Sequence, residues 1–391
     1  MATHYPQLTD HLDSNSVDGY LLDADGEDAN QYYLSGYHAP DNFATLYADG
    51  AVHLLLSELE YTRAKSDSDG ETVRKLSEFD YQETLETHGP ETARQRVMAA
   101  FVRDYGVESV GVPESFPVGT ADVLRDAGID VVTDYADVIG TIRAVKTDDE
   151  VEHVRRTQRA NEAAMDAAKS MLAAATVEDG VLHHDGDVLT SEAVRREIEL
   201  TLLKRGCAMD NCIVACGAAA ARAHDFGSGP LEPHIPIVID IFPKDKSSGY
   251  CSDMTRAFVK GEPEAWVREW YDHTHDAYEA ALGAIEAGVT GEAVHDAVCD
   301  VYEAAGFPTL RSDESTEDGF FHSTGHGVGL DVHEAPRLGQ GGGELEDGHI
   351  VTVEPGLYEQ GTGGVRIEDI VVVRDDGYEN LTEYPTELTV L

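Results

Sequence analysis

Four acidic residues stand inside apolar segments of the C-terminal half, where charged side chains are normally excluded. Asp240 follows the run IPIVI, Asp253 precedes TRAF, Glu354 follows IVTV, and Glu368 lies between GVRI and DIVVV. An isolated buried carboxylate is very costly, so each of these must be paired or bind a metal ion. A single such residue is more often a salt-bridge partner, but four in one domain with few basic neighbours favour cations.

A histidine-rich segment, HSTGHGVGLDVHE, carries His322, His326 and His333, and His224 lies further upstream. A lone histidine is more often a satisfied core residue, but beside four carboxylates a ligand role for His326 is the better interpretation. Oxygen-rich ligands with one imidazole suit Mn²⁺, Co²⁺, Zn²⁺ or Fe²⁺ and do not distinguish among them. Four carboxylates would over-neutralise one divalent ion, so the sequence predicts two.

Short apolar runs alternate with helical segments in residues 1–145. GYLLDAD, FATLYADGAVHLLL, SVGVP and IDVVTD predict strands, and segments 91–106 and 118–128 predict helices that end at glycine. Strands that alternate with helices are typical of an α/β domain. No catalytic cluster is evident in this half, so we expect a supporting domain.

The pattern changes near residue 147. Thr147 and Glu150 form a capping box before a helix that we expect to reach about Ala175. Further helices are predicted at 191–206, 263–288 and 290–306, and strands at 236–242, 249–261, 350–358 and 363–373. Segment 177–190 is predicted to be a polar loop between two helices. Together these elements predict an α+β domain over residues 146–391.

The charge balance excludes some partners. The chain has 28 Lys and Arg against 75 Asp and Glu, a formal net charge of −47. Such a surface repels nucleic acid and anionic lipid. Disordered acidic tails, a cation buffer or adaptation to a salt-rich cytoplasm could explain it. The acids are spread through periodic segments, which favours salt adaptation, typical of a halophile. We expect a cytoplasmic protein, because no apolar run of about 20 residues and no signal segment is evident.

The five cysteines form no CxxC pair, and their number is odd, which is a poor basis for disulfides or a zinc site. Cys207, Cys212 and Cys216 lie close in sequence and could suggest a metal site. Buried free thiols are the better interpretation.

The order D…SDMTR…GHGVGL…VHE…EPGLY…GVRIED, over about residues 140–391, resembles the pita-bread (M24-type) metallopeptidases. This family includes methionine aminopeptidases and Xaa-Pro dipeptidases and aminopeptidases. The resemblance implies that the metal ligands are Asp240, Asp253, His326, Glu354 and Glu368. Asp253 and Glu368 would bridge two ions, with Asp240 on one and His326 and Glu354 on the other.

The resemblance also assigns residues that face the substrate. It implies that His224 and His333 donate hydrogen bonds to the substrate or to the developing oxyanion, and that His322 and Arg366 contribute to substrate binding. Glu354 is expected to carry the proton, because it can contact both metal and water. The catalytic residues would then be Glu354, His224, His333 and Arg366.

The N-terminal half resembles the creatinase-type domain of Xaa-Pro peptidases, on NQYYLSGY followed by LLLSELEYTRA. Minimal methionine aminopeptidases lack that domain. The resemblance therefore implies an enzyme with two divalent ions, manganese favoured, that cleaves the peptide bond between an N-terminal residue and proline. It also implies a homodimer. A same-fold hydrolase of a non-peptide amide, a methionine aminopeptidase and a catalytically inactive binding module stay open.

Two segments depart from the family pattern. The step from Asp240 to Asp253 is longer than usual, which makes Asp245, in the polar tip between them, a less favoured rival first ligand. The segment 177–190 is also longer than usual and could be surface decoration or a lid. Both departures concern the substrate preference more than the metal centre.

The charge predicts that folding depends on salt. Raising KCl from about 0.01 M to 1 M shortens the screening length from roughly 30 Å to 3 Å, so repulsion among the 75 acids should fall. We expect the midpoint of thermal unfolding to rise by several degrees or more. Sucrose, which does not screen charge, is the matched control. An unchanged or lower midpoint in molar KCl would contradict salt adaptation.

Overall fold

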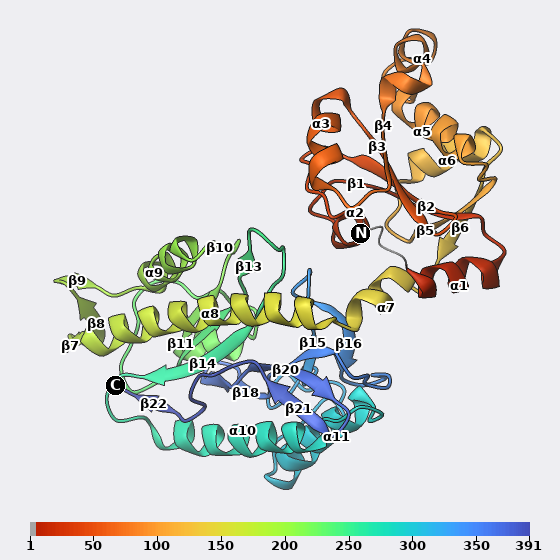
Figure 1. The fold of residues 1–391 in the computed structure, drawn as a ribbon. Coiled ribbons are helices and arrows are strands. Elements are labelled where there is room, and N and C mark those ends of the chain that lie inside the picture. Colours follow the sequence, from red (N-terminus) through yellow and green to blue (C-terminus); the bar gives the residue numbers. More distant parts are fainter. Residues whose placement is uncertain (1–4) are drawn as a thin grey trace. The chain divides into compact units, whose positions relative to one another are not determined.

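The computed structural model describes residues 5–391, and the chain divides into two compact units, Met1–Arg143 and Ala144–Leu391 (Figure 1). The division falls after Arg143, and the boundary predicted from the sequence was at residue 145. Each unit has its own apolar cores and is described separately.

The first unit is built on a six-stranded mixed sheet in the order β4-β3-β2-β1-β5-β6. The β1–β2 and β2–β3 pairs are antiparallel, and the other three pairs are parallel. The strands are β1 (Gly19–Ala24), β2 (Phe43–Ala48), β3 (Ala51–Leu56), β4 (Thr72–Lys75), β5 (Ser109–Pro113) and β6 (Asp130–Asp134). All four strand-like runs of the sequence lie in this sheet.

Helices cover both faces of that sheet, because alternate strand residues feed two cores. Tyr20 and Leu22 of β1 belong to a core shared with α1, α2, α3 and α7, whereas Leu21 belongs to one shared with α5 and α6. The helices are α1 (Pro6–Asn15), α2 (Ala29–Ser35), α3 (Glu58–Asp67), α4 (Tyr81–His88), α5 (Ala93–Asp104), α6 (Val118–Asp126) and α7 (Val138–Ala144), with a 3-10 turn η1 (Leu76–Phe79). The predicted α/β class is confirmed.

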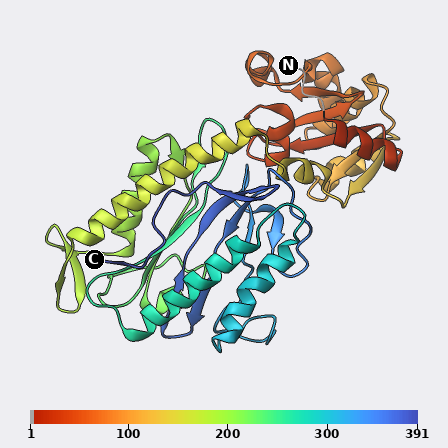
Figure 2. The same ribbon diagram turned by 60° about the horizontal axis from the view of Figure 1, so that its bottom comes forward.

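In the second unit, two pairs of helices enclose curved strands. Figures 1 and 2 show α8 and α10 on opposite sides of these strands. The helices are α8 (Asp148–Ala174), α9 (Ser191–Lys204), α10 (Ala265–Ala284) and α11 (Gly291–Ala304), with a 3-10 turn η2 (Gly217–Ala221). The predicted capping box is confirmed, since Thr147 Oγ1 accepts from the Glu150 amide and the Glu150 carboxylate accepts from the Thr147 amide.

Apart from a small sheet at residues 176–188, the strands of this unit form a four-stranded sheet, a five-stranded sheet and two short ribbons. The first sheet is β11 (Ile213–Cys216), β12 (Ile237–Ile241), β14 (Met254–Val259) and β22 (Thr389–Val390). The second is β16 (Glu334–Leu338), β15 (Gly325–Gly327), β17 (Ile350–Val353), β20 (Asp369–Arg374) and β21 (Gly377–Asn380). The ribbons are β10 (Cys207–Ala208) with β13 (Lys244–Asp245), and β18 (Gly356–Glu359) with β19 (Gly363–Arg366). The α+β prediction is confirmed.

The prediction of a polar loop at 177–190 is wrong. The segment forms a small antiparallel sheet of β7 (Thr176–Glu178), β8 (Val181–His184) and β9 (Asp187–Val188). Two Asp-Gly pairs make the turns, and all four residues have positive φ: 48° at Asp179, 82° at Gly180, 52° at Asp185 and 89° at Gly186. Two-residue turns with positive φ at both positions match the twist of a hairpin, which is why Asp-Gly favours them.

All five cysteines are free thiols, and Cys216 is the one that is partly exposed. Burial raises the pKa of the Cys207 thiol to about 11, so this thiol is neutral and unsuited to metal binding at neutral pH. Within residues 5–391, no helix combines the length and the apolar character that crossing a membrane requires.

A buried arginine joins the two larger sheets of this unit. The Arg256 side chain in β14 is 2% exposed, and Nη2 donates to Asp369 Oδ1 in β20 at 2.7 Å. Nη1 donates to the backbone oxygen of Glu368 at 2.7 Å, and Nη2 and Nε donate to the backbone oxygens of Tyr384 and Pro385. The guanidinium therefore fixes β14, β20 and the C-terminal segment to one another.

Replacing Arg256 should be far more costly than replacing a surface arginine. Arg256→Ala leaves the Asp369 carboxylate buried without its cation, which costs about 3–5 kcal/mol of unfolding free energy. The matched control is Arg268→Ala, whose ion pair with Glu262 at 3.0 Å is exposed and contributes about 0–1 kcal/mol. Urea unfolding at constant KCl measures both losses. Equal, small losses would contradict the linking role of Arg256.

Candidate metal centre

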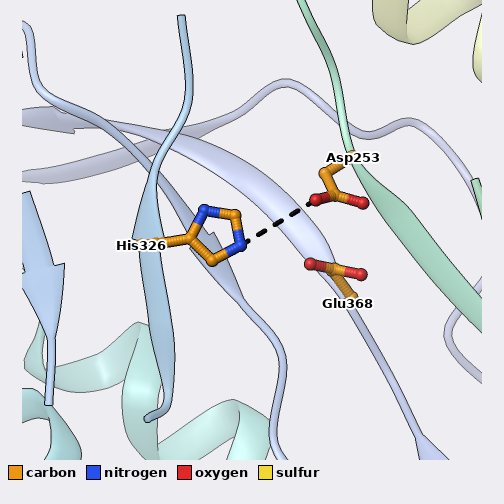
Figure 3. A group of neighbouring side chains, drawn as sticks. All are labelled: Asp253, His326 and Glu368. Atoms are coloured by element: carbon orange, nitrogen blue, oxygen red, sulfur yellow. Dashed lines mark ion pairs between the residues drawn. The ribbon is translucent and has the colours of Figure 1, made fainter. Parts of the chain in front are cut away.

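Three predicted ligands converge at one point of the second unit. Asp253, His326 and Glu368 each offer one ligand atom, and these atoms lie within 4.8 Å of one another. Figure 3 shows the imidazole of His326 facing both carboxylates. His326 Nε2 lies 3.9 Å from Asp253 Oδ2 and 3.4 Å from Glu354 Oε1, so Glu354 belongs to the same group.

Strand alternation brings Asp240 and Asp253 to this point. In β12 the isoleucines at 237, 239 and 241 face the core under α8 and α9, so Asp240 shares the opposite face with Val238. Asp253 directly precedes β14, which pairs antiparallel with β12 in a register that sets Asp240 opposite Thr255. Both carboxylates therefore leave the same face of one sheet.

Glu354 and Glu368 come from the other sheet. Strands β17 and β20 are antiparallel, and Val353 pairs with Asp369. Glu354 follows β17 and Glu368 precedes β20, so the two residues continue this pairing at the same end of the two strands. The site thus lies where four strand ends from two sheets meet.

The carboxylates are buried and crowded. Burial, and then the charges of Glu368 and Asp240, raise the pKa of Asp253 well above its ordinary value. Burial and neighbouring carboxylates likewise raise the pKa of Glu368. Burial raises the pKa of Glu354 to about 8, although the Arg366 charge opposes it. Without cations, this site therefore holds protons at neutral pH.

Two buried oxygens fit a metal-binding role. Within the described residues, Asp240 Oδ1 and Asp253 Oδ1 accept no hydrogen bond. Leaving a buried carboxylate oxygen unpaired is costly, and a divalent cation is the partner that such oxygens prefer beside one imidazole. The donor set present therefore fits divalent metal ions.

His326 is in the tautomer that a ligand needs. Its Nδ1 lies 3.1 Å from the carbonyl oxygen of Gly327, which can only accept, so Nδ1 carries the proton and Nε2 presents its lone pair to the carboxylates. Burial lowers the pKa of His326 to about 4, so the ring is neutral at pH 7.

Arg366 lies among the carboxylates in a hydrogen-bond network that includes two residues, Thr255 and Tyr358, that the sequence analysis did not single out. Its Nη2 donates to Asp240 Oδ2 at 2.5 Å, its Nε to Thr255 Oγ1 at 3.0 Å and its Nη1 to Tyr358 Oη at 3.0 Å. Thr255 in turn donates to Glu368 Oε2 at 2.6 Å. Thr255 and Tyr358 stand in the SDMTR and EPGLY motifs, so their position beside predicted ligands was the available signal.

Both ring nitrogens of His322 are occupied. Nδ1 donates to the carbonyl oxygen of Ser323 at 2.7 Å, so Nε2 accepts from Tyr358 Oη at 3.1 Å. Burial lowers the pKa of this ring to about 3, which keeps it neutral. In this arrangement His322 has no free N–H for a substrate, and it contacts Arg366 through Tyr358.

A cavity of about 1090 Å³ opens onto the carboxylates. Its walls are largely apolar, with Ile213, Phe226, Phe242, Phe321 and Val332. His224, His333 and Arg337 also line it, and the rings of His333 and His326 lie 4.3 Å apart. The sequence analysis had not singled out Arg337.

The rival ligand Asp245 lies outside this cavity. Its Oδ1 accepts from the amides of Ser247 and Ser248 at 2.8 and 2.9 Å and faces Arg156 Nη2 at 3.2 Å. Asp245 therefore stabilises the turn of the longer hairpin.

Two known family models match the chain: "Metallopeptidase family M24" matches residues 152–375, and "Creatinase/Prolidase N-terminal domain" matches residues 6–145. The chain belongs to metallopeptidase family M24. This confirms the family resemblance and the pita-bread fold predicted for the catalytic domain. Membership of the M24 family implies a dinuclear metal site and a peptide substrate.

Relatives match along nearly the whole chain. An Xaa-Pro dipeptidase of Pyrococcus furiosus is 30% identical over 99% of this chain and 100% of its own length. The prolidase structure from Pyrococcus horikoshii has a TM-score of 0.80 at 27% identity, covering 98% of this chain and 99% of that chain. The Xaa-Pro dipeptidase structure from Bacillus anthracis has a TM-score of 0.82 at 25% identity, covering 99% and 98%.

The raised carboxylate pKa values predict proton release on metal binding. At pH 7 Glu354, with a pKa of about 8, is largely protonated in the metal-free protein, and divalent ions bind the ionised form. We expect about one proton or more to leave per chain, and fewer as the pH rises above that pKa. Titration calorimetry with Mn²⁺ in buffers of different ionisation enthalpy measures this release.

The control is Glu354→Gln. Its amide has no carboxyl proton to lose, so Mn²⁺ binding should release fewer protons from this variant than from the wild type. Binding heats that are the same in every buffer would contradict the protonated state of the site.

Proposed function

We propose that this M24 enzyme is an Xaa-Pro peptidase that uses two divalent ions to hydrolyse the bond between an N-terminal residue and proline. The single observation that supports it most is the complete donor set, four carboxylates and the free Nε2 of His326, at the base of one cavity. Relatives that match along the whole chain are named Xaa-Pro dipeptidases.

We assign the metal ligands as the family resemblance implies: Asp240, Asp253, His326, Glu354 and Glu368 would hold two divalent ions, with Asp253 and Glu368 shared between them. When bound, two such ions polarise a carbonyl and lower the pKa of water. Arg366 and Thr255 orient Asp240 and Glu368 through the hydrogen bonds described above. We assign manganese as the favoured metal.

The remaining roles fall to side chains that line the cavity. Glu354, which would be ionised once the metal ions are bound, takes a proton from the attacking water and returns it to the departing nitrogen. His224 and His333 donate hydrogen bonds to the substrate carbonyl oxygen as negative charge develops there. His322 holds Tyr358, which orients Arg366. The amide before proline has no N–H, so an apolar wall leaves no donor unsatisfied.

Arg337 favours a dipeptide substrate. It is exposed at the cavity, and among residues 5–391 no acidic side chain lies within ion-pair distance of its guanidinium. An unpaired arginine is notable in a chain with 75 acids and 28 basic residues. A guanidinium matches a carboxylate in geometry and charge, so Arg337 is placed to bind the C-terminal carboxylate of Xaa-Pro.

Three further assignments rest on the sequence. The net charge of −47 supports a salt-rich cell, and an acid-rich chain adapted to a salt-rich cytoplasm supports a cytoplasmic location. The family resemblance supports a homodimer.

Hydrolysis by metal-stripped protein in molar KCl tests the function. We expect release of proline from an Xaa-Pro dipeptide only after Mn²⁺ or Co²⁺ is added, and little release of methionine from a peptide without proline. A folded protein that binds two ions and cleaves neither peptide would overturn the proposed substrate.

A variant at Arg337 tests whether the enzyme acts as a dipeptidase or as an aminopeptidase. Arg337→Met should raise KM for the dipeptide by about tenfold or more, because a charge-assisted hydrogen bond of roughly 1.5–3 kcal/mol is lost. KM for an Xaa-Pro-Xaa peptide should change little. Arg222→Met, which removes a surface arginine paired with Asp225, is the control. Equal effects on both substrates would remove Arg337 from carboxylate recognition.

A further inference from the structure

A buried ion pair lies at the edge of the cavity, outside the residues assigned so far. Lys146 Nζ contacts Glu334 Oε1, and the two side chains are 1% and 8% exposed. Lys146 lies between α7 and α8, and Glu334 is the first residue of β16 and lines the cavity. Lysine is almost never fully buried unless it is paired, so the carboxylate fixes where this ammonium lies.

The backbone holds Lys146 in place from the other side. Its amide donates to the carbonyl oxygen of Gly348 at 3.0 Å, and Val145 forms a β-bridge with His349. Residues 348 and 349 lead into β17, whose end carries Glu354. Lys146 is therefore attached to the strand that positions a proposed metal ligand.

The Glu334 side chain folds back against the loop that joins β15 to β16. Its carboxylate lies against Gly329, where an added Cβ would be 2.2 Å from Oε1. The loop is tight, because the Gly329 amide donates to Asp331 O at 3.0 Å and the Cys251 amide donates to Gly329 O at 2.7 Å. A carboxylate held at this place constrains the whole loop.

That loop ends at His333, the residue before Glu334. His333 lies in a bend that the Glu334 side chain closes, since the Asp331 amide donates to Glu334 Oε2 at 3.5 Å. Among residues 5–391 no hydrogen bond engages the His333 ring, which lies beside the His326 ring at 4.3 Å. Its position at the cavity therefore depends on the chain that carries it.

We propose that Lys146 is a positioning residue of the active site: its ammonium holds Glu334, and Glu334 keeps His333 directed at the substrate. This rests on the proposed function, in which His333 donates a hydrogen bond to the carbonyl oxygen. A purely stabilising ion pair is the alternative, and coupling to His333 distinguishes the two.

A double-mutant cycle measures that coupling. We compare the wild type, Lys146→Met, His333→Ala and the double variant by kcat and KM on an Xaa-Pro dipeptide at saturating Mn²⁺. Lys146→Met alone should lower kcat/KM by about tenfold or more, as loss of a supporting contact to a catalytic group does. In the His333→Ala background the same change should have little further effect, since the residue it positions is gone.

An equal loss in both backgrounds would overturn the proposal and leave the pair a stabilising role. Lack of wild-type activity would instead contradict the proposed function. Lys260→Met is the matched control, because this surface lysine donates to the Ala173 carbonyl oxygen and lies outside the cavity. Its kcat/KM should match that of the wild type.

A second variant covers the case in which Lys146→Met does not fold, and a second measurement does not depend on turnover. Glu334→Gln keeps the size of the side chain and should repeat the cycle if Lys146→Met does not fold. In metal-free protein with ¹³C-labelled histidine, the His333 ring signal, identified by its loss in His333→Ala, should shift in Lys146→Met and not in Lys260→Met. An unmoved signal, or failure of both variants to fold, would assign the pair to stability alone.

Discussion

The catalytic unit is organised around four carboxylates that are held together against their mutual repulsion. These carboxylates come from two sheets and belong to Asp240, Asp253, Glu354 and Glu368. Arg366 brings a positive charge into the group by its ion pair with Asp240. Burial, and then the charge of neighbouring carboxylates that one guanidinium cannot balance, raise the pKa values of Asp253, Glu354 and Glu368. The arrangement is stable as a protonated cluster or as a binding site for divalent ions, and metal-binding chemistry follows from that constraint.

The surrounding structure keeps those oxygens in place. Alternation along β12 directs isoleucines into the helix-covered core and Asp240 to the cavity. Behind Glu368, Arg256 joins its backbone to β14, and Thr255 donates to its carboxylate. Groups that orient the ligands of a metal site commonly matter nearly as much as the ligands themselves. The rigid strand framework therefore serves the geometry of the centre as well as stability.

The pattern of strands and helices predicted the fold classes, and the ordered motifs indicated the family. The group of residues at the cavity was predictable because acids in apolar runs, with histidines nearby, can be recognised without a structure. Tyr358 and Thr255 were missed because their contacts depend on strand pairing, such as the register that sets Gly356 opposite Arg366. Lys146 and Glu334 are 188 residues apart, and no local pattern relates them. The polarity of segment 177–190 indicates a loop, but its two Asp-Gly pairs favour the tight turns that make it a small sheet.

Metal stoichiometry tests the central claim most directly. Protein stripped of metal, titrated with Mn²⁺ in molar KCl and analysed for bound metal should take up two ions per chain. Asp253→Asn should lose both, because this carboxylate is proposed to bridge them, whereas Asp245→Asn should keep both, because Asp245 lies in a turn outside the cavity. A folded protein that binds no divalent ion would contradict the account. So would a protein whose ions are lost in the Asp245→Asn variant and kept in the Asp253→Asn variant.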